Sequence, residues 1–227
     1  WAKGYGYRQA GTSDPVTPDT LFQACSVSKP AVAVAVMRLV QEGELELDRD
    51  VNEYLRSWKI PSNGSWQPRV TLRQLLSHTA GTTVHGVEGY PLEHGLPSLL
   101  EVLEGKGAVK TPPVRVSIIP GMSFRYSGGG TTVVQQILED STNKPLADLV
   151  EELVLAPLGM ENSTYEQPLP EVHRTHAAVG HHADGTPLKG KWNGYAAVAA
   201  AGLWTTPSDL CRLVLEVQRA LRGEGRV

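Results

Sequence analysis

The chain has 227 residues, of which 41% are hydrophobic, and its formal net charge at pH 7 is -3. This length and hydrophobic content predict a globular protein with a sizeable core, built as one large domain or two closely packed lobes. Scattered lysine and arginine argue against nucleic-acid binding, and no apolar run approaches the roughly 20 residues that span a bilayer.

The N-terminal part of the chain is predicted to form a strand, a turn and a loop, followed by a buried helix. Aromatic residues alternate with glycine in residues 1–11, which predicts a strand and a turn, and a Pro/Thr/Asp-rich loop follows through residue 19. The run from Ser26 to about Glu42 is apolar on almost all sides and predicts a buried helix. Pro30 falls in its first turn, where a missing N–H costs little, and Gly43 ends it.

Short amphipathic helices joined by loops are predicted next. The segment VTLRQLLSH at residues 70–78 predicts a helix capped by Thr71, and PSLLEVLEGKG at residues 97–107 predicts another. Residues 57–69 and 79–97 carry Gly, Pro, His and Trp without a clear period, which predicts long surface loops. Such loops in a compact domain often line sites.

Three further helices follow from hydrophobic spacing, at residues 129–140, at residues 146–155 and after Thr206. Thr206-Pro207-Ser208-Asp209 predicts the start of the last one, since it combines a cap, a proline at the first position and an acidic third residue. Its predicted apolar stripe is Leu210, Leu213, Val214, Val217 and Leu221. Strand signals at the ends and helices between them predict an α/β lobe interrupted by a helical lobe.

Ser26 and Lys29 are candidates for acyl-transfer chemistry, because a serine and a lysine three apart on a helix project from the same face. A lysine held against a core at the positive end of a helix tends to lose its proton. The alternative is that Ser26 is a helix cap and Lys29 reaches solvent. A second Ser-x-x-Lys run, Ser141–Lys144, is explained by solvent exposure and a turn before Pro145.

Other catalytic classes are not favoured. Cys25 and Cys211 have neither metal-ligand spacing nor a disulfide framework and are interpreted as small buried residues. Four histidines close in sequence lack a supporting helix or an acidic ligand, so no metal site is predicted; they are His173, His176, His181 and His182. A G-x-S-x-G elbow is absent from the sequence, which disfavours a classical α/β-hydrolase.

Five ordered blocks resemble the class C β-lactamases and the related penicillin-recognising enzymes and esterases. The longest is DTLFQACSVSKPAVAVAVMRLVQEGELELDRDVNEYL at residues 19–55, which resembles the nucleophile region. The others are LLSHTAG, PGMSFRYSGGGTTVVQQILE, LVLAPLGMENSTYE and AAGLWTTPSDLCRLV. Together they span most of residues 19–217, and five blocks in order are far more specific than one.

The resemblance implies a set of site residues. Ser26 corresponds to the acylated nucleophile, Lys29 to its proton-handling partner and Tyr126 to the catalytic tyrosine, with Ser127 and Gly128 at substrate-binding positions. The family has Asn or Ser at the position of Gly128, so a substrate-binding side chain is missing there and a preference for β-lactams or peptides is weakened. The resemblance implies no cofactor and no metal.

The resemblance also implies a fold, an α/β lobe with an antiparallel sheet flanked by helices and an inserted all-helical lobe. Residues 1–227 are expected to form one catalytic unit, with the α/β lobe at about 1–50 and 190–227 and the helical lobe at about 51–189. The family's Lys-Thr-Gly or His-x-Gly strand motif does not occur between residues 209 and 227. We therefore expect a unit incomplete at both ends, whose sheet a missing segment or a second chain completes.

Two classes of function follow from these expectations. The first is a serine hydrolase that cleaves an ester or amide through a Ser26 acyl-enzyme, with β-lactamase, D-alanyl-D-alanine carboxypeptidase and small-ester esterase as subclasses. The second is a catalytically silent penicillin-recognising fold that binds a ligand or scaffolds a partner. The compartment is not assigned, because the sequence at Trp1 reads like the middle of a sheet and leaves an upstream signal segment open.

Overall fold

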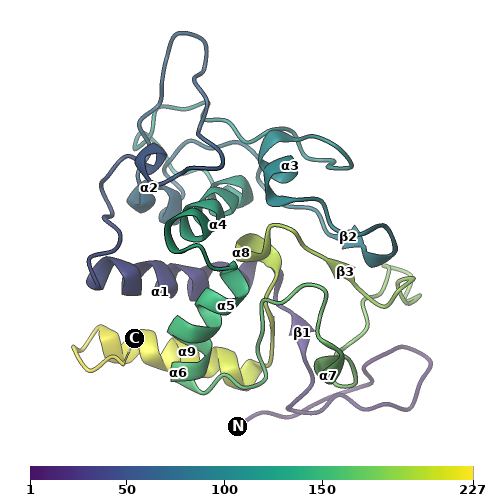
Figure 1. Ribbon diagram of the computed structural model, residues 1–227. Coiled ribbons are helices and arrows are strands. Elements are labelled where there is room, and N and C mark those ends of the chain that lie inside the picture. The colour runs from purple at the N-terminus through teal and green to yellow at the C-terminus, as the bar shows by residue number, and fades with distance from the viewer. Residues whose placement is uncertain (227) are drawn as a thin grey trace.

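The computed structural model describes residues 1–226 and is built mainly from helices and long loops (Figure 1). The helices are α1 (Ser28–Gln41), α2 (Leu72–Leu76), α3 (Leu99–Glu104), α4 (Gly128–Thr142), α5 (Leu146–Val150), α6 (Ala156–Leu158), α7 (Glu171–Arg174), α8 (Val198–Ala201) and α9 (Pro207–Ala220). Short 3-10 helices lie at Cys25–Val27, Val51–Glu53 and Leu92–His94, and a π-helical turn lies at Glu151–Leu155. The strands are β1 (Phe22–Gln23), β2 (Tyr90–Pro91), β3 (Asn193–Gly194) and β4 (Trp204–Thr205).

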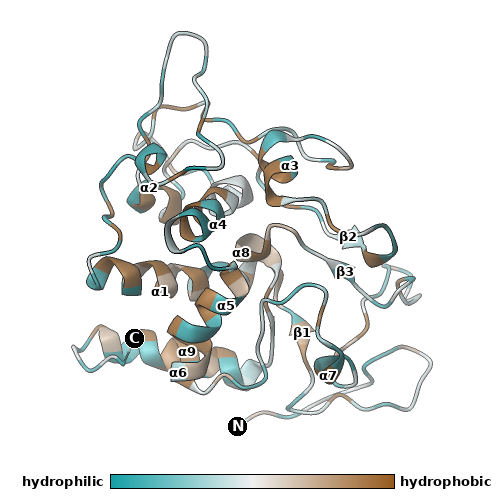
Figure 2. Cartoon of the chain, viewed as in Figure 1, coloured by the Kyte–Doolittle hydropathy of each residue, from teal (hydrophilic) through white to brown (hydrophobic). Residues whose placement is uncertain are grey.

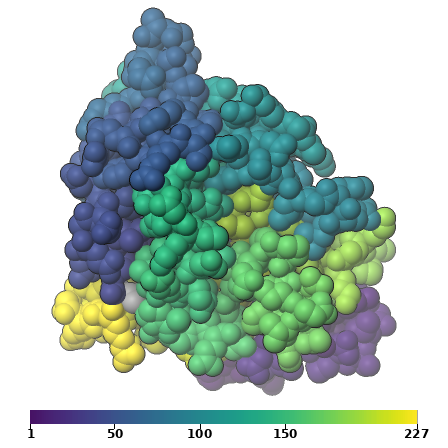
Figure 3. All heavy atoms as spheres, viewed as in Figure 1, coloured from purple at the N-terminus to yellow at the C-terminus, as the bar shows by residue number. Residues whose placement is uncertain are grey.

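The strands form two antiparallel pairs, β1 with β4 and β2 with β3. In the first pair Phe22 lies opposite Thr205, and the Ala24 N–H continues the contact by donating to the Leu203 carbonyl at 2.9 Å. This pairing joins the segment before α1 to the segment before α9, although they are far apart in sequence. The N-terminal segment and α9 consequently lie along the same edge of the molecule (Figure 3).

The strand predicted in residues 1–11 is wrong, because the described residues have only an isolated bridge there, between Tyr7 and Pro15. Gly6 and Gly11 adopt φ of +71° and +77°, outside the extended region that a strand requires. The alternation of aromatic residues with glycine therefore produces a folded loop. Its side chains Trp1, Tyr5 and Tyr7 are exposed.

Helix α1 crosses the core, as the apolar run predicts, and is largely hydrophobic along its length (Figure 2). One face is fully buried against the main hydrophobic cluster, while the opposite face includes Met37, which is exposed. Gly43, with φ +79°, follows the helix and ends it in the left-handed conformation that favours glycine. The buried face of α1 comprises Ser28, Ala31, Val32, Ala35, Val36 and Leu39.

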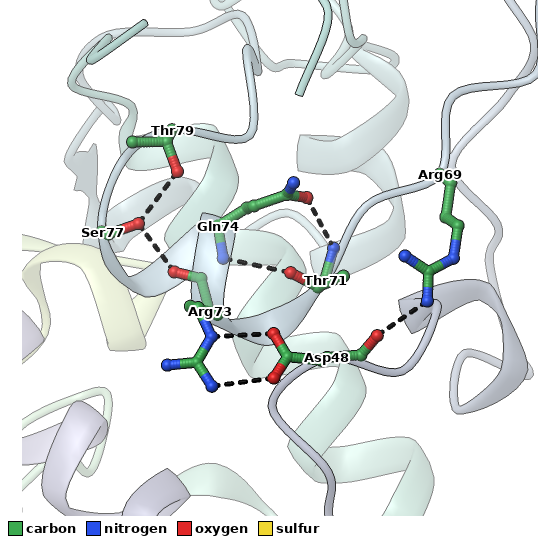
Figure 4. A network of polar contacts seen from close by, with 7 residues as sticks. All are labelled: Asp48, Arg69, Thr71, Arg73, Gln74, Ser77 and Thr79. Carbon is green, nitrogen blue, oxygen red and sulfur yellow. Dashed lines mark hydrogen bonds and ion pairs between the residues drawn. The ribbon is translucent and has the colours of Figure 1, made fainter. Parts of the chain in front are cut away.

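Helix α2 begins as predicted at Thr71. The Thr71 hydroxyl accepts from the Gln74 N–H at 3.3 Å, and the Gln74 side chain accepts from the Thr71 N–H at 3.0 Å. Arg73 holds the helix to the preceding loop through two bonds to the Asp48 carboxylate, at 2.7 and 2.8 Å (Figure 4). The hydrogen bond with Arg73 lowers the pKa of Asp48, and this effect outweighs the opposing effect of desolvation.

Helix α4 is the buried centre of the molecule and starts with three glycines. A Cβ on Gly129 would lie 2.8 Å from the Thr83 carbonyl oxygen, and one on Gly130 would lie 2.8 Å from the Thr82 hydroxyl. Only glycine permits this close approach between α4 and the loop that follows α2. The Gly129 N–H donates to the Val84 carbonyl at 3.0 Å, so the loop satisfies part of the helix N-terminus.

The helix predicted at residues 146–155 is divided into α5 and a π-helical turn, and α6 follows directly. Pro157 lies in α6 and has no N–H to donate to the carbonyl four residues earlier, which favours a wider turn at this point. Within the described residues no helix is both long and apolar enough to cross a bilayer.

Helix α9 starts at Thr206 as predicted, since the Thr206 hydroxyl accepts from the Asp209 N–H at 3.2 Å. Its predicted apolar stripe is only partly correct, because Leu213 is buried and Leu210 partly buried, whereas the rest of the stripe is exposed. The helix face that meets the core instead carries buried carboxylates, and Asp209 accepts from the Asn162 N–H at 2.9 Å. The exposed positions of the stripe are Val214, Val217 and Leu221.

Candidate active site

Ser26 lies in the 3-10 turn directly before α1, with its side chain exposed. The preceding residue, Cys25, has φ +45°, which is uncommon for a residue with a Cβ and sharpens the entry into the helix. The neighbouring Ser28 is buried, and its hydroxyl donates to the Cys25 carbonyl at 2.5 Å and accepts from the Leu203 N–H at 2.9 Å. Ser28 thus fixes the turn, while Ser26 faces outward.

Lys29 reaches back along α1 to Ser26. Its Nζ donates to the Ser26 hydroxyl at 3.0 Å and to the Ala200 carbonyl of α8 at 2.7 Å. The Gln135 side chain of α4 holds α8 in place, accepting from the Ala199 N–H at 3.2 Å. The alternative in which Ser26 caps the helix and Lys29 extends away into solvent is wrong, because no side-chain cap is formed and Lys29 Nζ is hydrogen-bonded to Ser26 and Ala200.

Tyr126 approaches Ser26 from the segment that leads into α4. Its hydroxyl donates to the Ser26 hydroxyl at 2.8 Å, and Lys29 Nζ lies 5.1 Å from the centre of its ring. Burial alone would raise the pKa of Tyr126, but contacts with Lys29 and Ser26 and the charge of Lys29 together lower it. Ser26, Lys29 and Tyr126 therefore meet at one point, although Tyr126 is 100 residues from Ser26.

Two histidines that sequence reasoning did not select lie beside Tyr126. The ring centres of His78 and Tyr126 are 4.5 Å apart, and those of His85 and Tyr126 are 5.0 Å apart. His78 also borders a largely apolar cavity of about 200 Å³ that extends behind Lys29 between α1, α2 and α4. The available signal was the LLSHTAG block, where the histidine was interpreted only as part of a family signature.

The substrate-binding expectation for the Ser127 side chain does not agree with its placement. Ser127 is buried, and its hydroxyl donates to the Thr83 carbonyl at 2.6 Å and accepts from the Gly130 N–H at 2.9 Å. This hydroxyl caps α4 and is not directed at Ser26. Gly128 is also buried, and a Cβ there would lie 3.1 Å from the His85 carbonyl oxygen, so this backbone leaves little space for a larger residue.

The second Ser-x-x-Lys run forms no comparable arrangement. Ser141 lies in the last turn of α4 and is partly buried, and its buried hydroxyl oxygen has no hydrogen-bond partner. Lys144 is exposed and pairs with Glu152. The expectation that solvent exposure explains Ser141 is therefore wrong, but the two side chains of the run are not brought together.

The predicted burial of both cysteines is wrong, since Cys25 and Cys211 are exposed free thiols. Cys25 Sγ lies 3.8 Å from the hydroxyl of Tyr195, beside the Ser26 turn. Burial, together with the nearby thiol, raises the pKa of Tyr195 to about 12, so this hydroxyl is protonated at neutral pH. Among residues 1–226 no group of three or more His, Cys, Asp or Glu side chains could hold a metal ion.

Comparison with known proteins places this geometry in context. The family model described as Beta-lactamase matches residues 1–227. The chain is 34% identical over 198 residues to esterase EstB of Burkholderia gladioli, which covers 82% of the chain and 47% of the esterase. It is 26% identical over 207 residues to the protein flp of Staphylococcus aureus strain MW2, covering 91% of the chain and 39% of that protein.

Solved structures agree with the sequence relatives. The octameric penicillin-binding protein homologue of Pyrococcus abyssi superposes with a TM-score of 0.74 and 25% identity, over 96% of this chain and 50% of that one. A class C β-lactamase superposes with a TM-score of 0.68 and 25% identity, over 98% of this chain and 56% of that one. The described fold is thus of the β-lactamase type, and the chain spans about half the length of these relatives.

Proposed function

Because this chain belongs to the β-lactamase family, we propose that it is a serine hydrolase in which Ser26 forms an acyl-enzyme with an ester or amide substrate. The observation that carries the proposal is the position of the Ser26 hydroxyl, which is 3.0 Å from Lys29 Nζ and 2.8 Å from the Tyr126 hydroxyl. These distances allow direct proton transfer between the groups.

The first step is attack by Ser26 Oγ on the substrate carbonyl carbon, with the Ser26 proton passing to the Lys29–Tyr126 pair. Because its pKa is lowered, Tyr126 is ionised more readily than an ordinary tyrosine, and the positive charge of Lys29 stabilises the phenolate. This phenolate accepts the Ser26 proton and becomes a phenol. The tetrahedral intermediate carries a negative oxygen, for which the backbone N–H of Ser26 supplies one donor.

The second step releases product and restores the serine. The intermediate collapses to the Ser26 ester, and the leaving alcohol or amine takes the proton held by the pair. Water then attacks the ester carbonyl, giving up one proton to the pair, and the acid leaves as Ser26 recovers its hydrogen. Lys29 and Tyr126 act in both steps, so they behave as one unit.

Small carboxylic esters are the proposed substrate class. Relatives with Asn or Ser at the position of Gly128 can offer a side-chain hydrogen bond to an amide-bearing substrate, and Gly128 cannot. The His85 carbonyl and Val87 occupy the adjacent space, 3.1 and 3.2 Å from an ideal Cβ. A missing polar contact reduces discrimination in favour of the substrate that needs it. The similarity to an esterase supports the same class.

Intact-mass measurement with a fluorophosphonate probe tests the nucleophile. The wild-type protein is expected to gain one phosphonyl group on Ser26, and Ser26→Ala is expected to gain none. Ser141→Ala is the matched control, because Ser141 begins the other Ser-x-x-Lys run, and it should label like the wild type. An unlabelled wild-type protein would favour the catalytically silent alternative, in which the fold binds a ligand or partner.

A further inference from the structure

His78 contacts the chain on both sides of Tyr126. The His78 carbonyl accepts from the Arg125 N–H at 2.7 Å, and its Nδ1 accepts from the Ser127 N–H at 3.3 Å. The imidazole lies against the ring of Tyr126, with 4.5 Å between centres and 40° between planes. One residue therefore holds the backbone immediately before and after the tyrosine and also contacts its ring.

The turn that carries His78 is itself anchored to α2. The Ser77 hydroxyl donates to the Arg73 carbonyl at 2.7 Å and lies 2.9 Å from the Thr79 hydroxyl (Figure 4). His78 adopts φ +57°, a left-handed conformation that asparagine tolerates better than most residues with a Cβ. The position of both acceptor groups is thus set by α2 and by an unusual backbone conformation.

The Ser127 N–H determines the protonation state of the ring. A backbone N–H can only donate, so Nδ1 must carry a lone pair and the proton of the neutral imidazole must be on Nε2. Burial and the nearby Lys29 charge lower the pKa of His78, which favours this neutral form. Among the described residues, the charged or titratable groups around the ring are Lys29 of α1 and Tyr126.

The other neighbours of His78 do not compete for its proton. Helices α2 and α4 contribute Leu75, Leu76, Thr131 and Val134 to the cavity beside it, and Phe124 meets its ring edge-on at 5.9 Å. A proton on Nδ1 would replace an attractive contact with Ser127 by two opposed N–H groups. It would also add a positive charge beside Lys29.

We propose that His78 is a positioning residue, which holds the Tyr126 hydroxyl against Ser26 only while its imidazole is neutral. This inference rests on the proposed function, since it assigns a role in the acylation of Ser26. Protonation of His78 releases the Ser127 N–H, loosens the segment that carries Tyr126 and slows proton transfer. Acylation therefore falls as the pH drops below the range in which His78 is neutral.

Kinetic measurements on two His78 variants distinguish the hydrogen bond accepted by Nδ1 from the packing volume of the side chain. His78→Ala removes the Nδ1 acceptor and is expected to lower kcat by about 100-fold with little change in KM, the effect of displacing a catalytic group by about 1 Å. His78→Asn keeps the left-handed backbone and places an amide oxygen near the position of Nδ1, so it should recover most of that loss. As the pH is lowered, the acylation rate should fall less for His78→Asn than for the wild type, because this variant has no imidazole to protonate at position 78. We call this fall in rate at low pH the acid-side decrease.

His85→Asn is the matched control, because the His85 ring also contacts Tyr126. The hydrogen bond of His85 to the segment after Tyr126 uses its backbone carbonyl, which accepts from the Gly128 N–H at 2.8 Å and is kept in the variant. This variant should retain the acid-side decrease. Unchanged kcat and an unchanged pH profile in both His78 variants would overturn the inference. Loss of the acid-side decrease in His85→Asn, with its retention in His78→Asn, would also overturn it.

A spectroscopic measurement on the wild-type protein tests the hydrogen bond between the Ser127 N–H and His78 Nδ1 without an activity assay. Long-range ¹H–¹⁵N correlation of the histidine rings should show His78 at pH 7.5 with hydrogen on Nε2 and none on Nδ1. A proton on Nδ1 would overturn the inference, whatever the protein hydrolyses. A wild-type protein that is not acylated would instead overturn the proposed function, and the tautomer would still decide whether His78 accepts from Ser127.

Discussion

Ser26 and Ser28 are two residues apart, but substitution by alanine should affect different properties. Ser28→Ala should mainly lower stability, and Ser26→Ala should mainly abolish labelling. Ser28→Ala leaves the Leu203 N–H without its partner, in a place where both residues are fully buried. An unsatisfied buried donor costs about 1–3 kcal/mol, and loss of the bond to the Cys25 carbonyl adds about 1 kcal/mol. Ser28→Ala should therefore lower the free energy of unfolding by about 2–4 kcal/mol.

Ser26→Ala should lower the free energy of unfolding far less, by about 0.5 kcal/mol, because the hydroxyl is exposed and caps no helix. Urea unfolding followed by tryptophan fluorescence measures both effects as changes in midpoint at constant slope. The same samples, below the transition, test labelling by the fluorophosphonate. Equal stability of the two variants, or labelling lost in Ser28→Ala and kept in Ser26→Ala, would refute this assignment of roles.

Further predictions concern the chemistry, the packing and the effect of pH. Lys29→Ala and Tyr126→Phe should each lower the acylation rate by about 10³-fold or more, with a double variant little slower than either, whereas small additive losses would indicate merely packed residues. Measured kcat/KM should be higher for p-nitrophenyl butyrate than for nitrocefin, and the reverse order would contradict the proposed ester preference. Gly129→Ala should destabilise the fold by about 1–3 kcal/mol in urea unfolding, because its Cβ would lie 2.8 Å from the Thr83 carbonyl oxygen, and an unchanged midpoint would contradict this packing. The pKa of His78 is lowered in the folded state, so the unfolded chain takes up this proton first and the stability that His78 contributes is lost as the pH falls below about 6.5. Urea midpoints at pH 7.5 and 5.0 should consequently differ less for His78→Asn than for the wild type, and equal differences would count against this linkage.

The sequence alone determined those elements that depend on neighbouring residues. A hydroxyl cap with a suitable residue three positions later is a local signal of a helix start, and Thr71 and Thr206 form such caps in the structure as predicted. The apolar run after Ser26 predicted the buried helix α1 for the same reason, since hydrophobic spacing is a local property. The ordered family blocks predicted the fold, which the structural comparisons confirm.

Local patterns were less reliable where burial depends on the rest of the fold. The apolar positions Val214 and Val217 satisfy the helical period of α9, yet the described chain leaves them exposed and buries Asp209. The glycines in residues 1–11 permit a strand pattern in sequence but adopt conformations that a strand excludes. Periodicity predicts which residues share a face, and only the tertiary structure decides what that face meets.

The candidate site shows the same division most clearly. The spacing of Ser26 and Lys29 places them one helical turn apart, which the sequence predicts without further information. The Ala200 carbonyl, Tyr126 and His78 come from distant segments that α4 and α8 bring together. No local pattern encodes those distances, because they result from packing between elements far apart in the chain. The tertiary structure alone therefore decided what holds Lys29 and Tyr126 against the serine.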